Sequence, residues 1–323
     1  MHPIVAELYA QLSLPLIAAP MFIVSTPELV IAQCAQGIVG SMPSLNARQA
    51  QDLTVWLERI DSALAQLKKQ EPERKIAPYA VNLIIHRSNP RVEHDLGVCA
   101  QHKVPIIITS LSAPHAVVDS VHAWGGKVFH DITTIRHAEK ALEAGVDGLI
   151  LVCNGAGGHA GTTNPLALTG EIRRFYNGPL ILSGAISRGQ DIAAALAMGA
   201  DFAYMGTRFI ASQQANATQE YQQAILDSSA KDVIYTPYFT GIPGNYLRAS
   251  IERAGLNPEQ LPQTKEIQIS DSKSKPWKDI WGAGQGVGNI DTIDTVADIV
   301  QRLRTEYQDT LTRLQHIHPG SQT

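Results

Sequence analysis

The regular alternation of short apolar runs with helix-like segments is the feature that most restricts how this 323-residue chain can fold. Runs that are apolar throughout are typical of parallel strands buried on both faces. Eight such strands separated by helices predict an α/β fold, a closed (β/α)8 TIM barrel rather than an open doubly wound sheet. The eight runs lie at 16–19, 38–41, 80–83, 106–109, 127–130, 148–152, 180–183 and 202–205.

Helix-start signals stand between the runs. Thr26 precedes Pro27, and Asn164 precedes Pro165, in the order expected of an N-cap and a first helical residue. Asn46 stands before a long segment with helical periodicity and is predicted to cap it.

The strand and helix rhythm ends after Ser212. Residues 213–226 are typical of a helix, whereas 235–278 are rich in Pro, Gly, Ser and charged residues and show no strand pattern. Near the end, 292–317 predict an amphipathic helix.

These patterns predict three parts of the chain. The barrel is expected over 1–211, and a smaller helical and loop excursion over 212–278 is expected to cover the active-site mouth. A C-terminal segment, 279–323, is expected to return to the barrel.

Composition argues against several function classes. The 26 Lys and Arg residues against 30 Asp and Glu residues give a formal charge of −4, so we expect no nucleic-acid partner. The N-terminus does not resemble a secretory leader, and no run approaches the roughly 18 apolar residues of a membrane span, so we expect no membrane association. Cys34, Cys99 and Cys153 fit no metal spacing and are expected to be buried thiols in a reducing, cytoplasmic compartment.

The active site of such a barrel forms at the carboxyl ends of its strands. Glycines follow the last two runs, where backbone N–H groups can bind a phosphate because no side chain blocks its approach. The alternative is that these glycines only form tight turns. Because no acidic metal cluster accompanies them, a phosphorylated organic cofactor or substrate is favoured. The candidate phosphate-binding residues are Gly184, Ala185, Gly206 and Thr207.

The glycine-rich segment after the sixth run is a second candidate. Gly155, Gly157 and Ala160 satisfy the spacing of a dinucleotide-binding fingerprint, but the next helix is expected only near Pro165, so we reject that match. Glycine here can instead leave room for a flat ligand. His159 lies within this segment and is the best acid/base candidate, since imidazole exchanges protons near neutral pH.

Three further features have two interpretations each. His130 at a strand end either touches a ligand or only hydrogen-bonds a neighbouring carbonyl. Asn82 either binds the imide edge of a heterocycle or caps a loop. The glycine-rich segment 281–286 either folds back to contact the ligand or only reverses the chain.

In their order along the chain, these motifs resemble those of the nitronate monooxygenase family, formerly called 2-nitropropane dioxygenases. This FMN-dependent barrel family also includes flavin-dependent enoyl-acyl-carrier-protein reductases and NADH:quinone reductases. The resemblance covers nearly the whole chain. Its motifs are Ala-Pro-Met at 19–21, Val-Asn-Leu at 81–83, Ala-Gly-Gly-His-Ala-Gly at 156–161, Ser-Gly-Ala at 183–185, Met-Gly-Thr-Arg-Phe at 205–209 and Gly-Gln-Gly at 284–286.

The resemblance implies that His159 is catalytic and that FMN is the cofactor. Residues 19–21 would run along the flavin ring, and Asn82 would hydrogen-bond it. The candidate phosphate-binding residues named above, which follow the seventh and eighth runs, would hold the phosphate. The implied cofactor-binding residues are Ala19, Pro20, Met21, Asn82, His130, Gly157, Gly158, Ser183, Gly184, Ala185, Met205, Gly206, Thr207, Gly284 and Gln285.

Two positions depart from the family pattern. Ala185 stands where many relatives have glycine, a small change because alanine leaves its backbone N–H available. Val152 stands where several relatives carry an acidic or amide residue, so one polar contact to the cofactor is missing.

The implied reaction converts an alkyl nitronate, or also its neutral nitroalkane, and O2 to a carbonyl compound and nitrite. In the nitroalkane case His159 would remove the α-proton, a task that suits a pKa near 7. The main alternative is an FMN-dependent NAD(P)H reductase of a quinone or an enoyl thioester. A flavin-binding protein without catalysis and a non-flavin aldolase or isomerase barrel are less favoured, and a homo-oligomer is compatible with the sequence.

Overall fold

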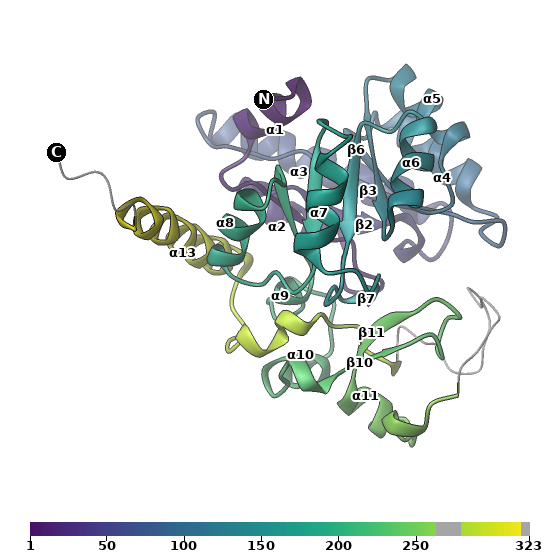
Figure 1. Ribbon diagram of the computed structural model, residues 1–323. Coiled ribbons are helices and arrows are strands. Elements are labelled where there is room, and N and C mark those ends of the chain that lie inside the picture. Colours follow the sequence, from purple (N-terminus) through teal and green to yellow (C-terminus); the bar gives the residue numbers. More distant parts are fainter. Residues whose placement is uncertain (263–278, 318–323) are drawn as a thin grey trace.

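Eight parallel strands form one sheet that closes on itself in the computed structural model, which describes residues 1–262 and 279–317 (Figure 1). The order around the sheet is β1-β9-β8-β6-β5-β4-β3-β2, and Ala18 N donates to Val39 O at 2.8 Å where β1 meets the residue before β2. The predicted TIM barrel is confirmed, and each predicted run overlaps one strand. The strands are β1 (Leu16–Ala18), β2 (Gly40–Pro43), β3 (Tyr79–Ile85), β4 (Ile106–Leu111), β5 (Lys127–Ile132), β6 (Gly148–Val152), β8 (Leu180–Ser183) and β9 (Phe202–Met205).

Helices follow the strands and cover the outside of the barrel. They begin where their caps predict at α2 and α7, and the Asn164 side chain accepts from Leu166 N at 2.9 Å. The prediction for Asn46 is wrong, because α3 begins only at Asp52 and Asn46 ends a short 3₁₀ turn. These helices are α2 (Pro27–Ala35), α3 (Asp52–Gln70), α4 (Val92–Gln101), α5 (His115–Ala123), α6 (Ile135–Glu143), α7 (Pro165–Arg173), α8 (Gly189–Ala197) and α9 (Thr207–Ile210).

Helix α1 (Pro3–Gln11) closes the amino end of the barrel. Its Val5 and Leu8 belong to the same buried cluster as the apolar side chains inside the barrel. The Tyr9 ring packs edge-on against Phe202, with ring centroids 5.3 Å apart. In Figure 1 this helix lies at the opposite end of the barrel from β7, β10 and β11, so that only the carboxyl end is left to form a site.

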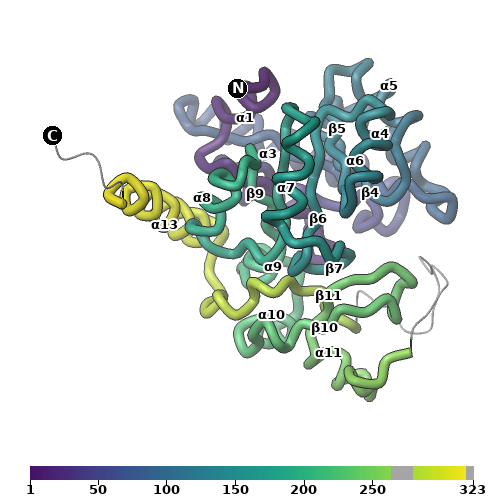
Figure 2. The backbone as a smooth tube through the Cα atoms, viewed as in Figure 1, coloured from purple at the N-terminus to yellow at the C-terminus, as the bar shows by residue number. Residues whose placement is uncertain are grey.

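A small antiparallel sheet lies across that carboxyl end (Figure 2). It consists of β10 (Val233–Thr236), β11 (Gly244–Leu247) and β7 (Gly158–His159), in the order β10-β11-β7. The prediction that 235–278 holds no strand is therefore wrong. Gly244 and Asn245 have low intrinsic strand preference, and they become a strand because they pair with β7, a contact far away in sequence.

The rest of the excursion is mainly helical where it is described. It contains α10 (Gln219–Leu226), shorter than the predicted 213–226, followed by 3₁₀ turn η2 (Ala230–Asp232), α11 (Arg248–Arg253) and η3 (Pro258–Gln260). Positions 263–278 of the predicted excursion lie outside the described residues.

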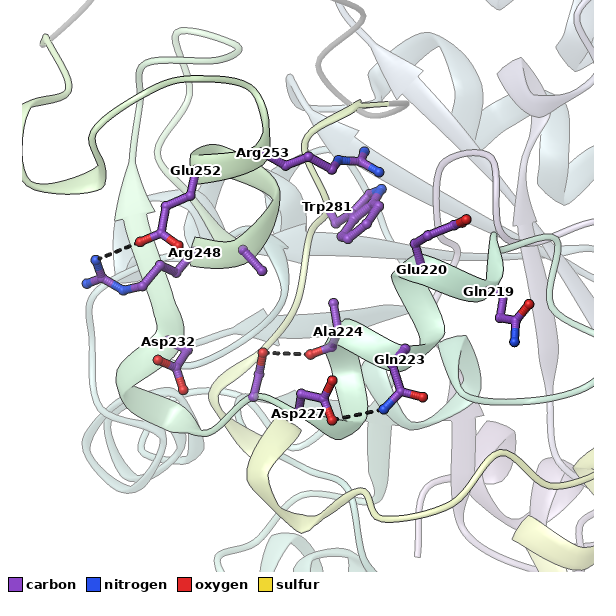
Figure 3. Close-up of a pocket in the computed structure, with 12 residues that line it drawn as sticks. Gln219, Glu220, Gln223, Ala224, Asp227, Asp232, Arg248, Glu252, Arg253 and Trp281 are labelled. Carbon is purple, nitrogen blue, oxygen red and sulfur yellow. Dashed lines mark hydrogen bonds and ion pairs between the residues drawn. The ribbon is translucent and has the colours of Figure 1, made fainter.

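Trp281 attaches the returning C-terminal segment to the excursion (Figure 3). Its ring stacks on the Tyr221 ring, with the two centroids 5.0 Å apart. The Arg253 guanidinium carbon lies 4.0 Å from the centroid of the Trp281 ring. A groove of about 620 Å³ between α10 and α11 borders this stack, and none of the residues that line it is a predicted site residue.

The C-terminal segment then reaches the outside of the barrel. After η4 (Gln285–Asn289), helix α13 (Val296–His316) packs along α8, which confirms the helix predicted over 292–317. The buried Arg208 guanidinium of α9 pairs with Asp294 at 3.0 Å and donates to Thr292 O at 3.0 Å, so the segment before α13 is fixed to the barrel.

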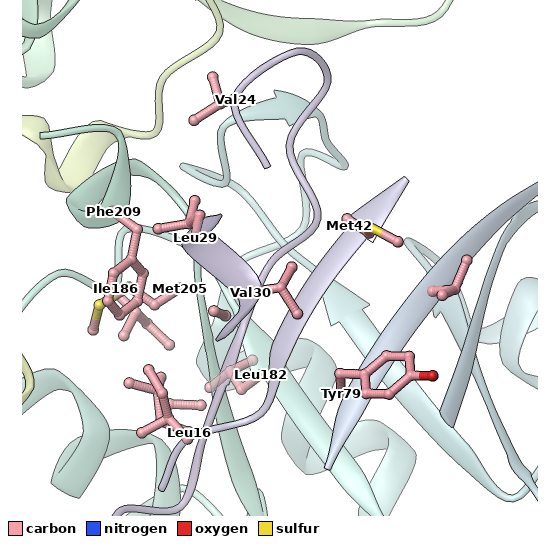
Figure 4. Close-up of a cluster of buried hydrophobic side chains, with 14 of the residues drawn as sticks. Leu16, Val24, Leu29, Val30, Met42, Tyr79, Leu182, Ile186, Met205 and Phe209 are labelled. Atoms are coloured by element: carbon pink, nitrogen blue, oxygen red, sulfur yellow. The ribbon is translucent and has the colours of Figure 1, made fainter. Parts of the chain in front are cut away.

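The larger core lies between the sheet and its surrounding helices (Figure 4). Leu16, Leu182 and Met205 face outward from the strands and are fully or almost fully buried. Cys34, Cys99 and Cys153 are buried and free, as predicted. Over residues 1–262 and 279–317, no helix combines the length and apolar character needed to cross a bilayer, and no group of acidic, His or Cys side chains could hold a metal ion.

The packing of α13 against α8 can be tested at Gly189, where a Cβ would overlap the Leu303 carbonyl oxygen and the Tyr307 amide nitrogen. Both atoms are backbone, so we expect Gly189→Ala to lower the free energy of unfolding by about 1–3 kcal/mol in urea titration. The matched control is Gly170→Ala on α7, where a Cβ meets nothing within 4 Å and stability should rise by about 0.5–1 kcal/mol. Equal effects of the two substitutions would contradict this packing.

Candidate active site

Four polar side chains form a layer inside the barrel near its carboxyl end. Each lies two positions beyond an apolar residue whose side chain points into the barrel and belongs to the same buried cluster as α1. Side chains two positions apart on a strand share a face, so the polar side chains also point into the barrel. The apolar residues are Ala80, Ile108, Phe129 and Phe202. The polar layer consists of Asn82, Ser110, Asp131 and Tyr204.

A chain of hydrogen bonds runs through this layer. Asn82 Nδ2 donates to Ser110 Oγ at 2.8 Å and to Ile108 O at 3.1 Å, and Ser110 Oγ donates to Asp131 Oδ2 at 2.7 Å. Both N–H bonds of the Asn82 amide are therefore used within the protein, and only its Oδ1 is left for a ligand. This narrows the predicted role of Asn82 to that of an acceptor.

Two buried oxygen atoms end the chain of hydrogen bonds. Asp131 Oδ1 and the Tyr204 hydroxyl have no hydrogen-bond partner among the described residues. Burial raises the pKa of Asp131 to about 7, against the smaller opposing effect of the Ser110 hydrogen bond. Burial, and then the nearby Asp131, hold the pKa of Tyr204 well above its usual value. Unpaired polar atoms are rare inside proteins, so they mark this layer as a place for a polar ligand.

His130 does not join this layer. It alternates with Phe129 and Asp131 along β5, and its ring hydrogen-bonds Thr109 Oγ1 at 2.8 Å on the face that packs against the helices. Burial, together with His137 on α6, lowers the pKa of His130 to about 4. Of its two predicted interpretations, the structure favours an internal hydrogen bond, made to a side chain rather than to a carbonyl.

The residues after β1 and β9 meet at the mouth. A Cβ built on Gly206 would lie 3.4 Å from Ala19 Cβ and 3.5 Å from Met21 Sδ, so these three residues are neighbours. Pro20 lies between Ala19 and Met21. The Met205 side chain, in contrast, is fully buried in the outer core, so only its backbone is near the mouth.

Asn46 holds the loop that carries Met21. Its Nδ2 donates to Met21 O at 3.0 Å and to Ser25 O at 2.8 Å, and its Oδ1 accepts from Ile23 N at 2.9 Å. Asn46 thus supports the β1–α2 loop and not the start of α3. No local sequence pattern indicates this role, because the burial of the Asn46 amide is visible only in the fold.

The loop after β6 is packed directly on the returning segment. A Cβ on Gly157 would lie 2.8 Å from Gly284 N, and a Cβ on Gly284 would lie 2.6 Å from Gly155 O, so neither position has room for a side chain. Gly284 N also donates to Thr207 Oγ1 at 2.9 Å. Segment 281–286 therefore folds back onto the glycine-rich loop and the phosphate-binding candidates, and does more than reverse the chain.

The backbone N–H of Ala185 was expected to be available for a ligand, and the structure shows otherwise. Its N–H donates to Gly155 O at 3.2 Å, and the same carbonyl accepts from Gln285 N at 2.9 Å. The N–H of Ala185 is therefore engaged within the protein and not available as predicted. Its φ of +56° is in the left-handed region, where glycine is favoured over alanine. The neighbouring Ser183 ends β8 and is mostly buried.

His159 lies in the short strand β7. It pairs with Gly244 of β11, while Gly158 pairs with Asn245. Its Nε2 lies 2.9 Å from Thr240 Oγ1, and Thr240 is 4% exposed. The hydroxyl of Thr240 also bonds the backbone of Ile242, which fixes its position.

Burial sets the protonation of His159. It lowers the pKa of the imidazole to about 4, so the ring is neutral at physiological pH. The expectation that His159 has a pKa near 7 is therefore wrong. A neutral ring can donate one hydrogen bond and accept another or accept a proton, but it carries no charge toward a ligand.

Two residues of the excursion hold the β6 loop in place and were not found from the sequence. Asn245 Nδ2 donates to Ala156 O at 2.6 Å, and the Tyr235 hydroxyl donates to Ala160 O at 2.9 Å. Both act through pairs more than 70 positions apart, which no local pattern reveals.

A comparison with profiles of known protein families identifies the family of this chain. A family profile described as nitronate monooxygenase matches residues 6–306, nearly the whole chain.

The chain belongs to the nitronate monooxygenase family.

Curated relatives agree with that assignment. A nitronate monooxygenase from Paraburkholderia phytofirmans is 28% identical over 301 residues, covering 80% of this chain and 81% of the relative. Two further curated bacterial relatives are matched over 66% and 57% of their own lengths. The chain is therefore an oxidoreductase of the nitronate monooxygenase family, whose members are flavin-dependent in general.

Two solved structures share the fold. FabK from Thermotoga maritima superposes with a TM-score of 0.77 at 24% identity, covering 98% of this chain and all of that chain. A nitroalkane oxidase from Streptomyces ansochromogenes gives a TM-score of 0.77 at 22% identity, covering 95% and 99% of the two chains. At these identities the likeness concerns the fold alone.

The raised pKa of Asp131 makes a prediction about stability. The protonated carboxyl is favoured in the folded protein, so its contribution to stability is complete below the unfolded pKa near 4 and is lost as the pH rises through about 7. We expect Asp131→Asn to become more stable relative to the unmodified protein by about 2–3 kcal/mol between about pH 5 and pH 8. Urea titrations of both proteins at the two pH values measure this, and a constant difference would contradict the buried, unpaired carboxyl.

Proposed function

We propose that this protein is an FMN-dependent nitronate monooxygenase that oxidises alkyl nitronates, and also neutral nitroalkanes, with O2 to carbonyl compounds and nitrite. The observation that carries the proposal is the position of His159. It is held by β11 and Thr240 at the carboxyl end of a barrel whose interior ends in a polar layer with unpaired atoms. Membership in the nitronate monooxygenase family supports the reaction class.

The residues at the mouth fit FMN. The buried Asp131 Oδ1 and Tyr204 hydroxyl call for a polar partner, and Asn82 Oδ1 adds an acceptor. A flavin ring carries both donors and acceptors on its pyrimidine edge, whereas its other edge is apolar. Val152 next to this layer leaves one side of the site without a polar contact, in agreement with its departure from the family pattern.

The phosphate of FMN would be held by the two glycine-bearing strand ends. Since Gly155 O already accepts the N–H of Ala185, we assign this role to the backbone of Gly184, Gly206 and Thr207. Ala19, Pro20 and Met21 would lie along the ring, next to Gly206. Gly157, Gly158, Gly284 and Gln285 would act mainly by building the loop that covers the site.

His159 would act as a neutral imidazole. With an alkyl nitronate, which is already deprotonated, the ring would donate its single N–H to the nitro group, in the tautomer whose Nε2 accepts from the Thr240 hydroxyl. With a neutral nitroalkane, the ring accepts the α-proton, and the hydrogen bond to Thr240 keeps its orientation. A base whose pKa is about 4 is weak, so we expect preformed nitronates to be the better substrates.

When bound, FMN supplies the redox chemistry between the substrate and O2, while the protein provides orientation and a dry site. A reductase acting on a quinone or an enoyl thioester would use the same cofactor site with NAD(P)H as the electron donor. Electron-donor preference therefore separates the two functions.

His159→Asn tests the catalytic role directly. The variant keeps a side chain of similar polarity at the position, so we expect FMN to stay bound, while nitrite release from a nitroalkane in air falls by about 10²–10⁴-fold. The loss with a preformed nitronate should be smaller, because no proton has to be removed from it. The matched control is His115→Asn at the exposed start of α5, which should leave both rates unchanged.

Two results would contradict this role. Unchanged nitrite release by the His159→Asn variant would remove His159 from the mechanism. Loss of FMN together with activity would make it a cofactor-binding residue only.

The low pKa of His159 gives a second prediction. Because the ring is neutral well above its pKa of about 4, the ratio of the unmodified rate to the His159→Asn rate should stay constant between about pH 5.5 and pH 8.5. Steady-state rates with FMN-saturated proteins measure this ratio. A ratio that falls toward one below about pH 6.5 would indicate an ordinary histidine that loses function on protonation.

A further inference from the structure

The proposed function counts Asp131 among the polar contacts of FMN but leaves open in which protonation state it acts. It is on the interior face of β5, two positions beyond Phe129. Its Oδ2 accepts the Ser110 hydroxyl at 2.7 Å, while its Oδ1 is shielded from solvent and has no hydrogen-bond partner among the described residues. An unpaired buried carboxyl oxygen is unfavourable unless a ligand satisfies it.

The hydrogen bonds around Asp131 all run toward it. Asn82 donates to Ser110, and Ser110 donates to Asp131 Oδ2, so Oδ1 is the free end of the chain. No ion pair among the described residues involves Asp131. A negative charge would therefore be poorly compensated here, and the neutral acid, which has an O–H to donate, is the form that the surroundings favour.

Tyr204 is an independent observation at the same place. It is 6% exposed on the interior face of β9, its hydroxyl has no partner among the described residues, and it is close enough for the Asp131 charge to affect it. Two unpaired oxygen atoms, both shielded from solvent in one layer, point to a ligand with several polar atoms rather than to a local packing fault.

We propose that Asp131 binds the cofactor as a neutral carboxylic acid, donating a hydrogen bond from its carboxyl group to an acceptor atom of FMN, so that binding takes up one proton at alkaline pH. This inference rests on the proposed function, because FMN is taken as the ligand. The proton comes from solvent and returns to it when FMN dissociates. The pKa of about 7 in the protein alone makes the uptake observable just above neutrality, since bound FMN would favour the acid further.

Two other titratable groups near the mouth, His159 and Tyr204, keep their charge in this range. Burial lowers the pKa of His159 on β7 to about 4 and raises that of Tyr204 on β9 well above 10. His130, with a pKa of about 4, and His137 on α6 lie on the helix-facing side of β5. The neighbouring strands contribute Ser110 from β4 and the apolar Ile150 and Val152 from β6. Asp131 is thus the group whose titration should govern binding.

The test is the affinity of the full-length protein for FMN, measured by quenching of flavin fluorescence between about pH 6 and pH 9. Above the pKa of the free carboxyl, the Kd of the unmodified protein should rise by up to about tenfold per pH unit. Asp131→Asn is always neutral, keeps an acceptor for Ser110 and offers an N–H donor. Its Kd should stay near the low-pH value of the unmodified protein over the whole range, after the shared ionisation of the FMN phosphate is taken into account.

A control and a second measurement complete the design. Asp119→Asn removes an exposed carboxylate on α5 and should keep the pH dependence of the unmodified protein. Calorimetry of FMN binding to the unmodified protein in two buffers with different ionisation enthalpies should give an uptake approaching one proton at about pH 8. This measurement does not depend on whether the Asp131 variant folds.

The outcomes separate the inference from the proposed function. Parallel pH dependence of the unmodified protein and the Asp131→Asn variant, or FMN binding without proton uptake, would overturn the role of Asp131 and leave the proposed function standing. Absence of FMN binding by the unmodified protein at every pH would overturn the proposed function and this inference with it.

Discussion

The close backbone packing between the loop after β6 and the segment around Gly284 is the contact on which the rest of the site depends. Gly157 and Gly284 approach so closely that a Cβ on either would overlap the other segment. This approach lets Gly155 O accept from both Ala185 N and Gln285 N, and lets Gly284 N donate to Thr207. Four segments from distant parts of the chain are thereby fixed at one end of the barrel, because only glycine permits their backbones to touch.

This packing also determines the electrostatics of the site. The covered loop becomes strand β7, paired with β11, and the resulting burial keeps His159 neutral and aligned by Thr240. Beneath it, the barrel interior ends in a layer where no ion pair among residues 1–262 and 279–317 involves Asp131, and burial favours the neutral form of this carboxyl. Neutral groups suit the anionic nitronate that we propose as substrate, since a carboxylate at the mouth would repel it.

The barrel could be predicted from the sequence because each strand is a local apolar run, but much of the site could not. The strands are apolar on both faces, so an alternation of polar and apolar residues does not reveal which side chains point inward. For this reason His130 was predicted to bind the cofactor, although its neighbour Asp131 is the residue that faces the interior. Strand β11 and the role of Asn46 depend on partners far away in sequence. The glycine-rich motifs were recognised, yet their crowding by other backbone segments became visible only in the fold.

The central claim is that a nitronate, rather than a nicotinamide, reduces the cofactor of this protein. The most direct measurement is anaerobic mixing of the FMN-loaded protein with an alkyl nitronate and, separately, with NADH and NADPH, followed by flavin absorbance. We predict that the nitronate bleaches the flavin and that admitting air restores the colour with release of nitrite, whereas the nicotinamides have little effect. Prompt bleaching by NADH or NADPH and none by the nitronate would contradict the account and identify a reductase.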